Sequence, residues 1–309
     1  MPFPQNLRCG PSGWNYPDWN SSVYDDPSAR GRHRIEFLAR YFDAIEINAT
    51  SYQFIRPEVA RLWVAKAAPF PRFLFSARLH RSFTHERKLE KHTVAAFREG
   101  ILPLKRAGRL GCLLMQFPWA FRFTAENREY LIQLRRAFHE FPLVGEFRHA
   151  SWTCEEARGT LIDYRVGFCN IDQAPFSSAT PPTALLTSRV AYVRFHGRNP
   201  QDWEPKAVSA APAPRHDYLY SGEELSAWKP RILSLAEHAP LVMVVMNNSA
   251  GGKSVVNALQ MRRFLAGDAG QAPAGLLECY PRDLEEFHAI LPLQRKLFAF
   301  APGTDRAVA

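Results

Sequence analysis

Eight short apolar segments recur along this chain, and each runs into polar residues at its carboxyl end. Apolar runs of this length without strict alternation are typical of strands buried on both faces, as in a parallel sheet. Amphipathic stretches separate most of the runs and are long enough to form crossover helices. This order predicts a single (β/α)8 TIM-type barrel, with an open doubly wound sheet as the alternative. The eight segments begin at Leu7, Ala44, Phe73, Gly111, Leu143, Val166, Val190 and Leu241.

Two parts of the chain depart from this pattern. The barrel is expected to occupy residues 1–267 of the 309 residues. Residues 198–220, after the seventh strand, are a long insertion rich in proline and alanine, and we expect a mobile segment at the rim of the barrel. Residues 268–309 form a C-terminal extension that we expect to pack on the barrel exterior.

The charge and the cysteines restrict the partners and the compartment. A net charge of +9 favours anionic partners, although a basic surface can also simply be solvated. No apolar run reaches the roughly 18 residues of a membrane span, and the first residues lack the apolar core of a secretory signal. Five cysteines without CxxC spacing fit a reduced interior. We therefore expect a cytoplasmic protein without a membrane partner; the sequence leaves its oligomeric state open.

Polar groups follow nearly every predicted strand, where barrels place their reactive side chains. Each group alone is explained by a salt bridge, but the whole set at one end of eight strands predicts a binding site. The candidate catalytic residues are Glu46, Glu146, His149, Asp172 and His196. The candidate substrate-binding residues are Asn48, Tyr52, Arg78, His85, Gln116, Arg148, Trp152, Arg194, Asn247 and Asn248.

The stretch MNNSAGGKS after the eighth strand is similar to half of a phosphate loop. A nucleotide P-loop requires a glycine where this chain has Asn247, so the motif excludes a P-loop nucleoside triphosphatase. Barrels often bind phosphate at the loop after the eighth strand and at the helix that follows it. Gly251 and Gly252 therefore predict a phosphate cradle, and a plain tight turn is the alternative.

Three arginines among the candidate residues point to an anionic substrate, because guanidinium groups prefer carboxylate or phosphate. Arg78 and Arg194 are expected to clamp that anion, and Glu146 to serve as general base or metal ligand. A divalent ion such as Zn²⁺ or Mn²⁺ suits the dispersed imidazoles and carboxylates, but the nearby arginines disfavour it. The metal and any other cofactor therefore stay open.

The leading hypothesis is a hydrolase that acts on a phosphate-bearing substrate, either a small molecule or a nucleic acid. Residues 78–92 are rich in basic side chains, and Tyr52 and Trp152 are expected to be exposed aromatic groups that a nucleic-acid base would contact. A binding protein without turnover and a carbohydrate-active enzyme are the alternatives. The latter is the weaker, because Gln116 and His196 stand where common barrel glycosidases carry their two carboxylates.

Seven strings of residues closely resemble, in the same order, the family called domain of unknown function 72. The resemblance covers about residues 10–265 and implies a TIM-barrel fold, without implying an activity. This chain departs from the family pattern at Arg78, where lysine is usual, and that change disfavours a Schiff-base mechanism at this position. It also departs at Ser249, where histidine is frequent, and in its long insertion after the seventh strand. The strings are SGWNYPDW, EINATSY, FSARLHRSFTHERKL, LLMQFPWAF, EFRHASW, YVRFHG and MNNSAGGKSVVNA.

Overall fold

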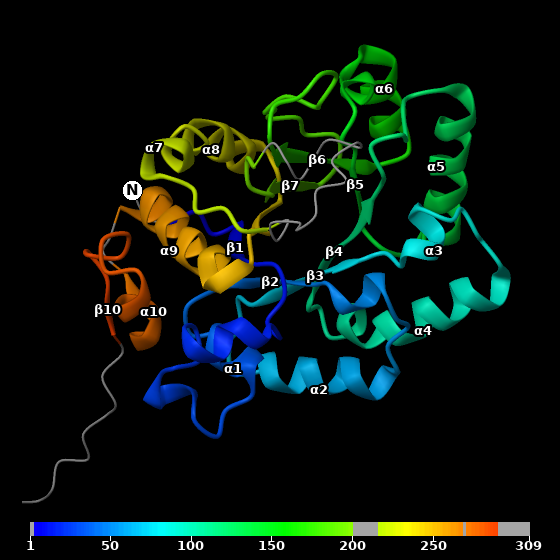
Figure 1. Ribbon diagram of the computed structural model, residues 1–309. Coiled ribbons are helices and arrows are strands. Elements are labelled where there is room, and N and C mark those ends of the chain that lie inside the picture. The colour runs from blue at the N-terminus through cyan, green and yellow to red at the C-terminus, as the bar shows by residue number, and fades with distance from the viewer. Residues whose placement is uncertain (1–2, 200–215, 268–269, 290–309) are drawn as a thin grey trace, which may run out of the picture.

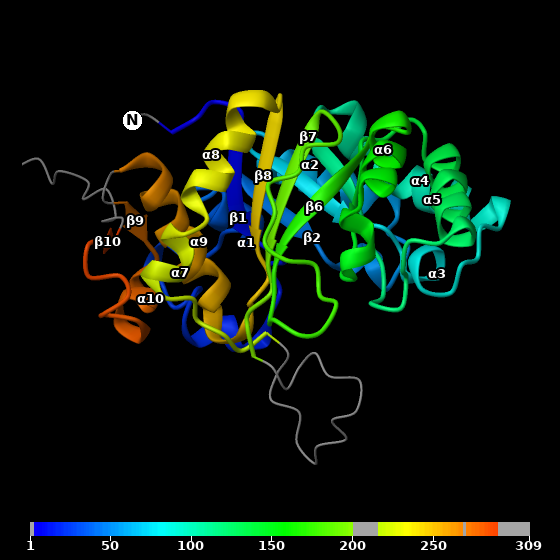
Figure 2. The ribbon, with the colours of Figure 1, turned by 90° about the horizontal axis from the view of Figure 1, so that it is seen from above.

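Eight parallel strands form the central sheet of the computed structural model, which describes residues 3–199, 216–267 and 270–289 (Figure 1). The sheet curves into a nearly closed barrel with its helices on the outside, as the sequence pattern predicts (Figure 2). The alternative of an open doubly wound sheet is excluded. The strands are β1 (Leu7–Pro11), β2 (Ala44–Ile47), β3 (Leu74–Arg78), β4 (Leu110–Gln116), β5 (Leu143–Glu146), β6 (Val166–Asp172), β7 (Val190–Phe195) and β8 (Leu241–Met246).

Helices follow most of the strands and cover the outer face of the barrel (Figure 1). Residues 173–189, between β6 and β7, contain no helix, as their proline-rich sequence predicts. The helices are α1 (Arg34–Leu38), α2 (Pro57–Ala67), α3 (Arg81–Thr84), α4 (Lys91–Arg106), α5 (Ala125–Ala137), α6 (Glu155–Asp163), α7 (Gly222–Ser226), α8 (Lys229–His238), α9 (Lys253–Ala266) and α10 (Ala274–Cys279).

The hydrogen-bonded strand order begins at β1 and ends at β2, so these two strands do not form a continuous ladder with each other. A few contacts between them close the barrel. Ser12 forms an isolated parallel bridge with Glu46, and the Gly13 N–H donates to the Glu46 carbonyl oxygen at 2.8 Å. A Cβ atom at Gly10 would lie 1.8 Å from the Ala44 carbonyl oxygen. Only glycine at this position lets β1 approach β2 closely enough to complete the barrel.

The interior of the barrel is apolar near the amino ends of the strands and polar near their carboxyl ends. Inward-facing residues alternate along each strand, so β7 contributes Val190 and Tyr192 to the apolar part and then Arg194 to the polar part. The apolar interior comprises Ala44, Cys112, Leu114, Val144, Cys169, Ile171, Val190, Tyr192, Met243 and Val245. The barrel interior is therefore a filled core, with a layer of polar side chains at the carboxyl ends of the strands, called the polar layer below.

The C-terminal extension is described for residues 270–289, which contain α10 and a small sheet of β9 (Gln271–Ala272) and β10 (His288–Ala289). The Ala274 N–H donates to Asp26 at 2.7 Å, and the Tyr280 hydroxyl donates to the Gly251 carbonyl oxygen at 2.9 Å. Residues 290–309 lie outside the described part, as do residues 200–215 of the expected rim segment. None of the described helices has the length and apolar character needed to cross a membrane.

Candidate functional site

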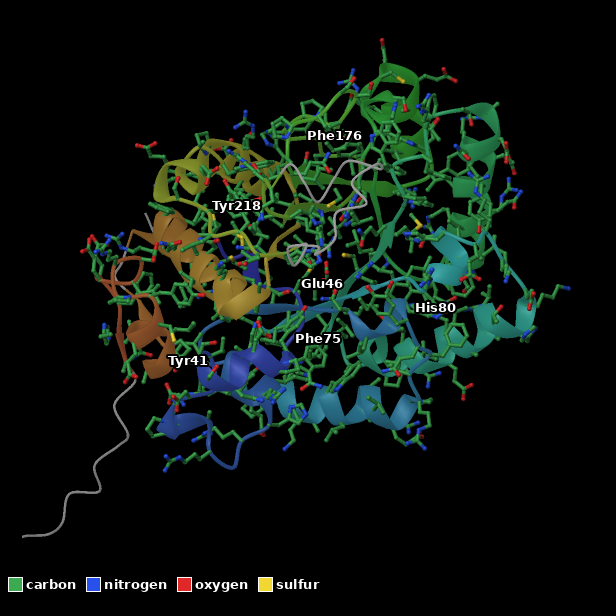
Figure 3. The ribbon with its side chains drawn as sticks, in the orientation of Figure 1. Tyr41, Glu46, Phe75, His80, Phe176 and Tyr218 are labelled. Carbon is green, nitrogen blue, oxygen red and sulfur yellow. The ribbon has the colours of Figure 1, made fainter. Side chains whose placement is uncertain are left out.

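A buried guanidinium between two buried carboxylates forms the centre of the polar layer. Arg194 on β7 donates from one terminal nitrogen to Glu46 on β2 and from the other to Glu146 on β5, both at 2.7 Å. All three side chains have at most 1% of their surface exposed, and Glu46 is labelled near the middle of Figure 3. Charges this deep in a protein are tolerated only when they are paired and hydrogen-bonded. The two terminal nitrogens of Arg194 are thus occupied by the protein's own carboxylates, and only its Nε is left without a partner among the described residues.

Glu46 has a complete set of partners. Besides Arg194 it accepts hydrogen bonds from the Ser12 hydroxyl at 2.6 Å and from the Tyr192 hydroxyl at 2.7 Å, and Tyr192 is in turn 2.8 Å from the Ser76 hydroxyl. Burial raises the pKa of the Glu46 carboxyl, but the charges of Arg194 and Arg78 outweigh burial and hold that pKa below its ordinary value. Glu46 is therefore ionised at neutral pH.

Glu146 is held by three donors. It accepts from Arg194, from Arg148 Nε at 3.0 Å and from His196 Nε2 at 3.2 Å. Burial raises the pKa of the Glu146 carboxyl, but the charges of Arg194 and Arg148 and the hydrogen bond from His196 outweigh burial and hold that pKa well below its ordinary value. A carboxylate with so low a pKa is a weak proton acceptor. This geometry does not favour the expected role of Glu146 as a general base.

His196 is buried and neutral. The Asn247 side-chain amide lies 3.1 Å from His196 Nδ1, so an N–H donated by Asn247 leaves the proton of the neutral ring on Nε2, which faces Glu146. Burial lowers the pKa of His196 to about 4, outweighing the attraction of Glu146. The same effect of burial lowers the pKa of the nearby His216 to about 3.

Arg78 is the last residue of β3, and it forms no ion pair with a described carboxylate. Its Nε is buried without a hydrogen-bond partner in the described part of the chain. Its guanidinium carbon lies 5.7 Å from the centre of the Tyr52 ring, and 66% of Tyr52 is exposed, as the sequence predicts for this aromatic group. Gln116 on β4 likewise has a buried side-chain oxygen without a partner. Arg78 and Gln116 thus both carry buried polar atoms without a partner among the described residues.

His85 and Asn48 lie at the edge of the same region. Burial and the charges of Arg78 and Arg81 lower the pKa of His85, so its ring is neutral at pH 7. Its Nδ1 lies 2.9 Å from the Thr84 hydroxyl. The side-chain oxygen of Asn48 lies 3.1 Å from the Ser12 hydroxyl, which donates its proton to Glu46.

Asp172 and Asn248 do not join this network. Asp172 accepts from the Tyr220 hydroxyl at 2.8 Å, from Trp228 Nε1 at 2.6 Å and from two nitrogens of Arg198 at 2.6 and 2.8 Å. These contacts lead outwards to the segment that carries α7 and α8. The Asn248 amide donates to the Tyr218 carbonyl oxygen at 2.7 Å and to Asn257 at 2.7 Å. Both candidates therefore hold helices against the barrel.

His149 and Trp152 have structural surroundings as well. His149 is the N-cap of a short 3-10 helix, Ala150–Thr153, and its Nδ1 accepts from the Ser151 N–H at 3.1 Å. Trp152 is fully buried, is stacked on Phe147 with ring centres 4.0 Å apart, and donates to the Phe121 carbonyl oxygen at 2.7 Å. The expectation of an exposed Trp152 is wrong, because the stack of aromatic rings beneath the β4 and β5 loops encloses it.

The contacts of the loop after β8 do not favour the expected phosphate cradle. The Gly251 N–H donates to the carboxylate of Asp18 at 2.6 Å, and Lys253 forms an ion pair with Asp217. The protein's own acidic side chains thus occupy two of the donors that a phosphate would use. Gly251 and Gly252 have φ values of 62° and 86°, which glycine adopts without strain. The alternative of a tight turn describes this loop.

Two members of the network, Ser12 and Tyr192, are absent from the candidates drawn from the sequence. Tyr192 is two residues before Arg194 on β7, so the strand period of two places both side chains on the inner face. That spacing is the signal that could have identified Tyr192. Among the described residues no group of three or more histidine, cysteine, aspartate or glutamate side chains could hold a metal ion.

The neutral histidines predict how stability depends on pH. An unfolded histidine has a pKa near 6.5, whereas folded His196 and His216 have pKa values of about 4 and about 3. The unfolded state therefore binds more protons below pH 6.5, and the free energy of unfolding is expected to fall steadily as the pH is lowered from 6.5 towards 4. Urea unfolding at pH 7.5, 6.0 and 5.0 measures this fall. The variant His196→Gln is expected to show a shallower fall, and an equal one would contradict the assignment.

Comparison with known proteins places this barrel among relatives. The model of the family described as "Protein of unknown function DUF72" matches residues 8–278. The UPF0759 protein YunF of Bacillus subtilis is 27% identical over 272 residues, which cover 84% of this chain and 94% of YunF. A crystal structure of a DUF72 family protein (TM1631) of Thermotoga maritima is 32% identical with a TM-score of 0.72, covering 84% of this chain and 98% of that one. A DUF72 family protein (EF0366) of Enterococcus faecalis, 23% identical with a TM-score of 0.71, shares the fold over 84% of this chain and 95% of its own.

Proposed function

We propose that this chain, which belongs to the DUF72 family of proteins of unknown function, binds a phosphate-bearing ligand at the carboxyl-terminal face of its barrel and hydrolyses it. The observation that carries the proposal is the guanidinium of Arg78, which has a buried Nε without a hydrogen-bond partner and forms no ion pair with a described carboxylate, although Glu46 lies near enough to feel its charge. A ligand oxyanion would supply the missing acceptor. Phosphate suits this site because its oxygens accept charge-assisted bonds from guanidinium groups.

The balance of charge in the polar layer supports an anion. Three guanidiniums, of Arg78, Arg148 and Arg194, stand against the two carboxylates of Glu46 and Glu146, so one positive charge is in excess. Glu46 and Glu146 are both committed to Arg194, and their screening of Arg78 is therefore partial. An uncompensated charge that is partly removed from water attracts a counter-charge more strongly than it does in bulk solvent.

The reaction that these groups support is hydrolysis of a phosphoester. Neutral His85 can accept a proton from a water molecule whose oxygen attacks the phosphorus, while the bond from phosphorus to the leaving oxygen breaks. The histidinium can then return that proton to the leaving oxygen. Arg78 and Arg148 would stabilise the charge on the phosphoryl oxygens. Glu146 acts in this proposal by orienting Arg148 and His196, because its own pKa is too low for a base.

The rim of the site favours nucleic acid among phosphate-bearing ligands. Tyr52 and Phe54 are exposed to 66% and 37%, and the Phe54 ring lies 4.4 Å from that of His80. Exposed rings next to a guanidinium are the groups on which unpaired bases stack. A short single-stranded oligonucleotide is therefore a suitable probe beside inorganic phosphate.

The variant Arg78→Gln tests the proposal. Loss of one charge-assisted contact is expected to weaken binding of inorganic phosphate at least about tenfold, measured by isothermal titration calorimetry. Hydrolysis of bis(4-nitrophenyl) phosphate is expected to fall by about 100-fold or more in His85→Asn, which keeps the phosphate affinity. Arg61→Gln is the matched control, because Arg61 is an exposed arginine on α2 that pairs only with Glu58 among the described carboxylates.

The outcomes separate three functions. Equal phosphate affinity in Arg78→Gln and in the wild type would remove the proposed site. Binding without turnover of any phosphoester, tested with and without Mn²⁺ or Zn²⁺, would identify a binding protein. Turnover of aryl glycosides in place of phosphoesters would establish the carbohydrate-active alternative.

A further inference from the structure

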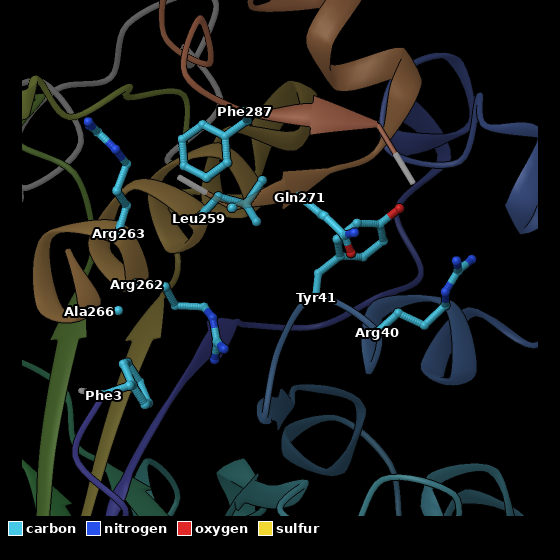
Figure 4. Close-up of a pocket in the computed structure, with 10 residues that line it drawn as sticks. Phe3, Arg40, Tyr41, Leu259, Arg262, Arg263, Ala266, Gln271 and Phe287 are labelled. Carbon is cyan, nitrogen blue, oxygen red and sulfur yellow. The ribbon is translucent and has the colours of Figure 1, made fainter. Parts of the chain in front are cut away.

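A cavity lies at the end of the barrel opposite the polar layer, near the amino ends of β1 and β2. Its volume is about 230 Å³, several times the roughly 30 Å³ that a water molecule occupies in the liquid. The carboxyl-terminal half of α9 forms one side, and Arg40 and Tyr41, in the segment between α1 and β2, form another (Figure 4). Phe3 and Phe287 complete the walls. None of the residues discussed for the carboxyl-terminal face takes part in this cavity.

Arg40 is the first reason to expect a ligand there. One terminal nitrogen of its guanidinium is buried and has no hydrogen-bond partner in the described part of the chain, and no ion pair of Arg40 is found there. The hydroxyl of the adjacent Tyr41, a residue that is only 5% exposed, makes no hydrogen bond of acceptable geometry among the described residues, and the Ser28 hydroxyl lies near it. A buried guanidinium nitrogen without a partner beside a poorly paired hydroxyl is unusual in a folded protein and calls for an additional acceptor.

The arginines around the cavity favour an anion as that acceptor, although Asp26 contributes a negative charge near Tyr41. Asp43 lies 3.0 Å from Arg262 and 3.4 Å from Arg72, and it also accepts the Cys9 N–H at 2.8 Å. The contact between Asp43 and Arg262 is electrostatic alone, because that nitrogen of Arg262 has no hydrogen bond of acceptable geometry. The Asp43 carboxylate thus pairs with both Arg262 and Arg72, and it forms no ion pair with Arg40.

The walls of the cavity add a preference for a flat ring. The rings of Phe3, Tyr41 and Phe287 line it together with the apolar side chain of Leu259. The guanidinium of Arg262 lies 4.9 Å from the centre of the Phe3 ring, so one aromatic wall already carries a cation on its face. Pockets that combine apolar walls with a few convergent polar groups are the usual sites for small molecules.

We propose that this cavity binds a small anion that carries an aromatic ring, with its phosphonate, phosphate or carboxylate group beside Arg40 and its ring between Phe3, Tyr41 and Phe287. The site is independent of the function proposed above. It lies at the face where the barrel is otherwise closed by its core, which favours a ligand that regulates or stabilises the fold over one that is turned over.

Phenylphosphonate is the probe, since it carries both features and has no ester bond to hydrolyse. We expect it to raise the melting temperature of the full chain and to bind in calorimetry, more tightly than methylphosphonate, which lacks the ring, or benzyl alcohol, which lacks the charge. Arg40→Gln is expected to weaken phenylphosphonate binding at least about tenfold. Arg78→Gln, at the other face, is expected to leave this binding unchanged.

A second variant protects the test against a folding defect. Ala266 lines the cavity from α9, and Ala266→Phe is expected to fill it and to abolish phenylphosphonate binding while Arg40 stays in place. Phenylphosphonate binding that survives both Arg40→Gln and Ala266→Phe would overturn the proposal. Binding lost in Arg78→Gln alone would assign the probe to the carboxyl-terminal face and overturn it as well.

Discussion

Replacing Arg194 with methionine is expected to destabilise the protein by about 3–5 kcal/mol, the usual cost of removing one partner from a buried ion pair. The substitution leaves Glu46 and Glu146 as neighbouring buried charges without their shared cation. One or both carboxyls would have to take up a proton, so the loss should be larger at pH 8 than at pH 5. Chemical unfolding of the wild type and the variant at both pH values measures the effect.

Two further variants isolate the cause of that loss. Arg61→Met removes an exposed arginine of α2 and is expected to change the free energy of unfolding by no more than about 0.5 kcal/mol. Adding Glu46→Gln and Glu146→Gln to Arg194→Met removes the uncompensated charges and is expected to recover part of the stability. A loss below about 1 kcal/mol in Arg194→Met would mean that water reaches the two carboxylates.

Replacing Trp152 with alanine is expected to cost about 3–5 kcal/mol, as large truncations in a well-packed core do. Trp152 is fully buried against the rings of Phe147 and Phe121, with ring centres at 4.0 and 5.4 Å, and its Nε1 makes a hydrogen bond. The variant loses the packing and leaves the Phe121 carbonyl oxygen without that donor. Thermal or urea unfolding, followed by circular dichroism, measures the loss.

Trp152→Phe provides the graded control for this prediction. Phenylalanine keeps a ring in the stack and loses only the indole donor and part of the volume, so its effect should be clearly smaller. Tyr52→Ala truncates an aromatic residue that is 66% exposed and is expected to leave stability within about 0.5 kcal/mol of the wild type. Equal losses in Trp152→Phe and Trp152→Ala would show that the hydrogen bond, rather than the stack, supplies the stability.

The fold was largely predictable because the buried parallel strands appear in the sequence as short, nearly continuous apolar runs. A strand covered on both faces must be apolar throughout, and segments such as Leu241–Met246 satisfy this condition. The same property hides which residues face inwards, since both faces are apolar. On β6, Cys169 and Ile171 belong to the inner cluster, so Asp172 faces outwards. Because the sequence does not show which face of β6 points inwards, the prediction placed Asp172 in the site.

The candidate site was predicted in its composition and only partly in its arrangement. Glu46, Glu146 and Arg194 converge because each is an inner residue at the carboxyl end of its strand. His149 and Trp152 follow β5 directly, but the chain turns there into a short 3-10 helix and carries their side chains away. Such turns depend on local capping, and sequence spacing alone does not resolve their direction.

The bridge that Arg194 makes between two distant strands has a consequence for how the chain assembles. Its partners are 148 and 48 residues away in sequence, so neither half of the barrel contains the whole bridge. A fragment with β1–β4 alone would carry Glu46 without its counter-ion, whereas one with β5–β8 would hold Arg194 with half of its acceptors. The buried charges of each half are fully paired only when the two halves are joined. The bridge therefore penalises half-folded states and makes assembly of the barrel cooperative.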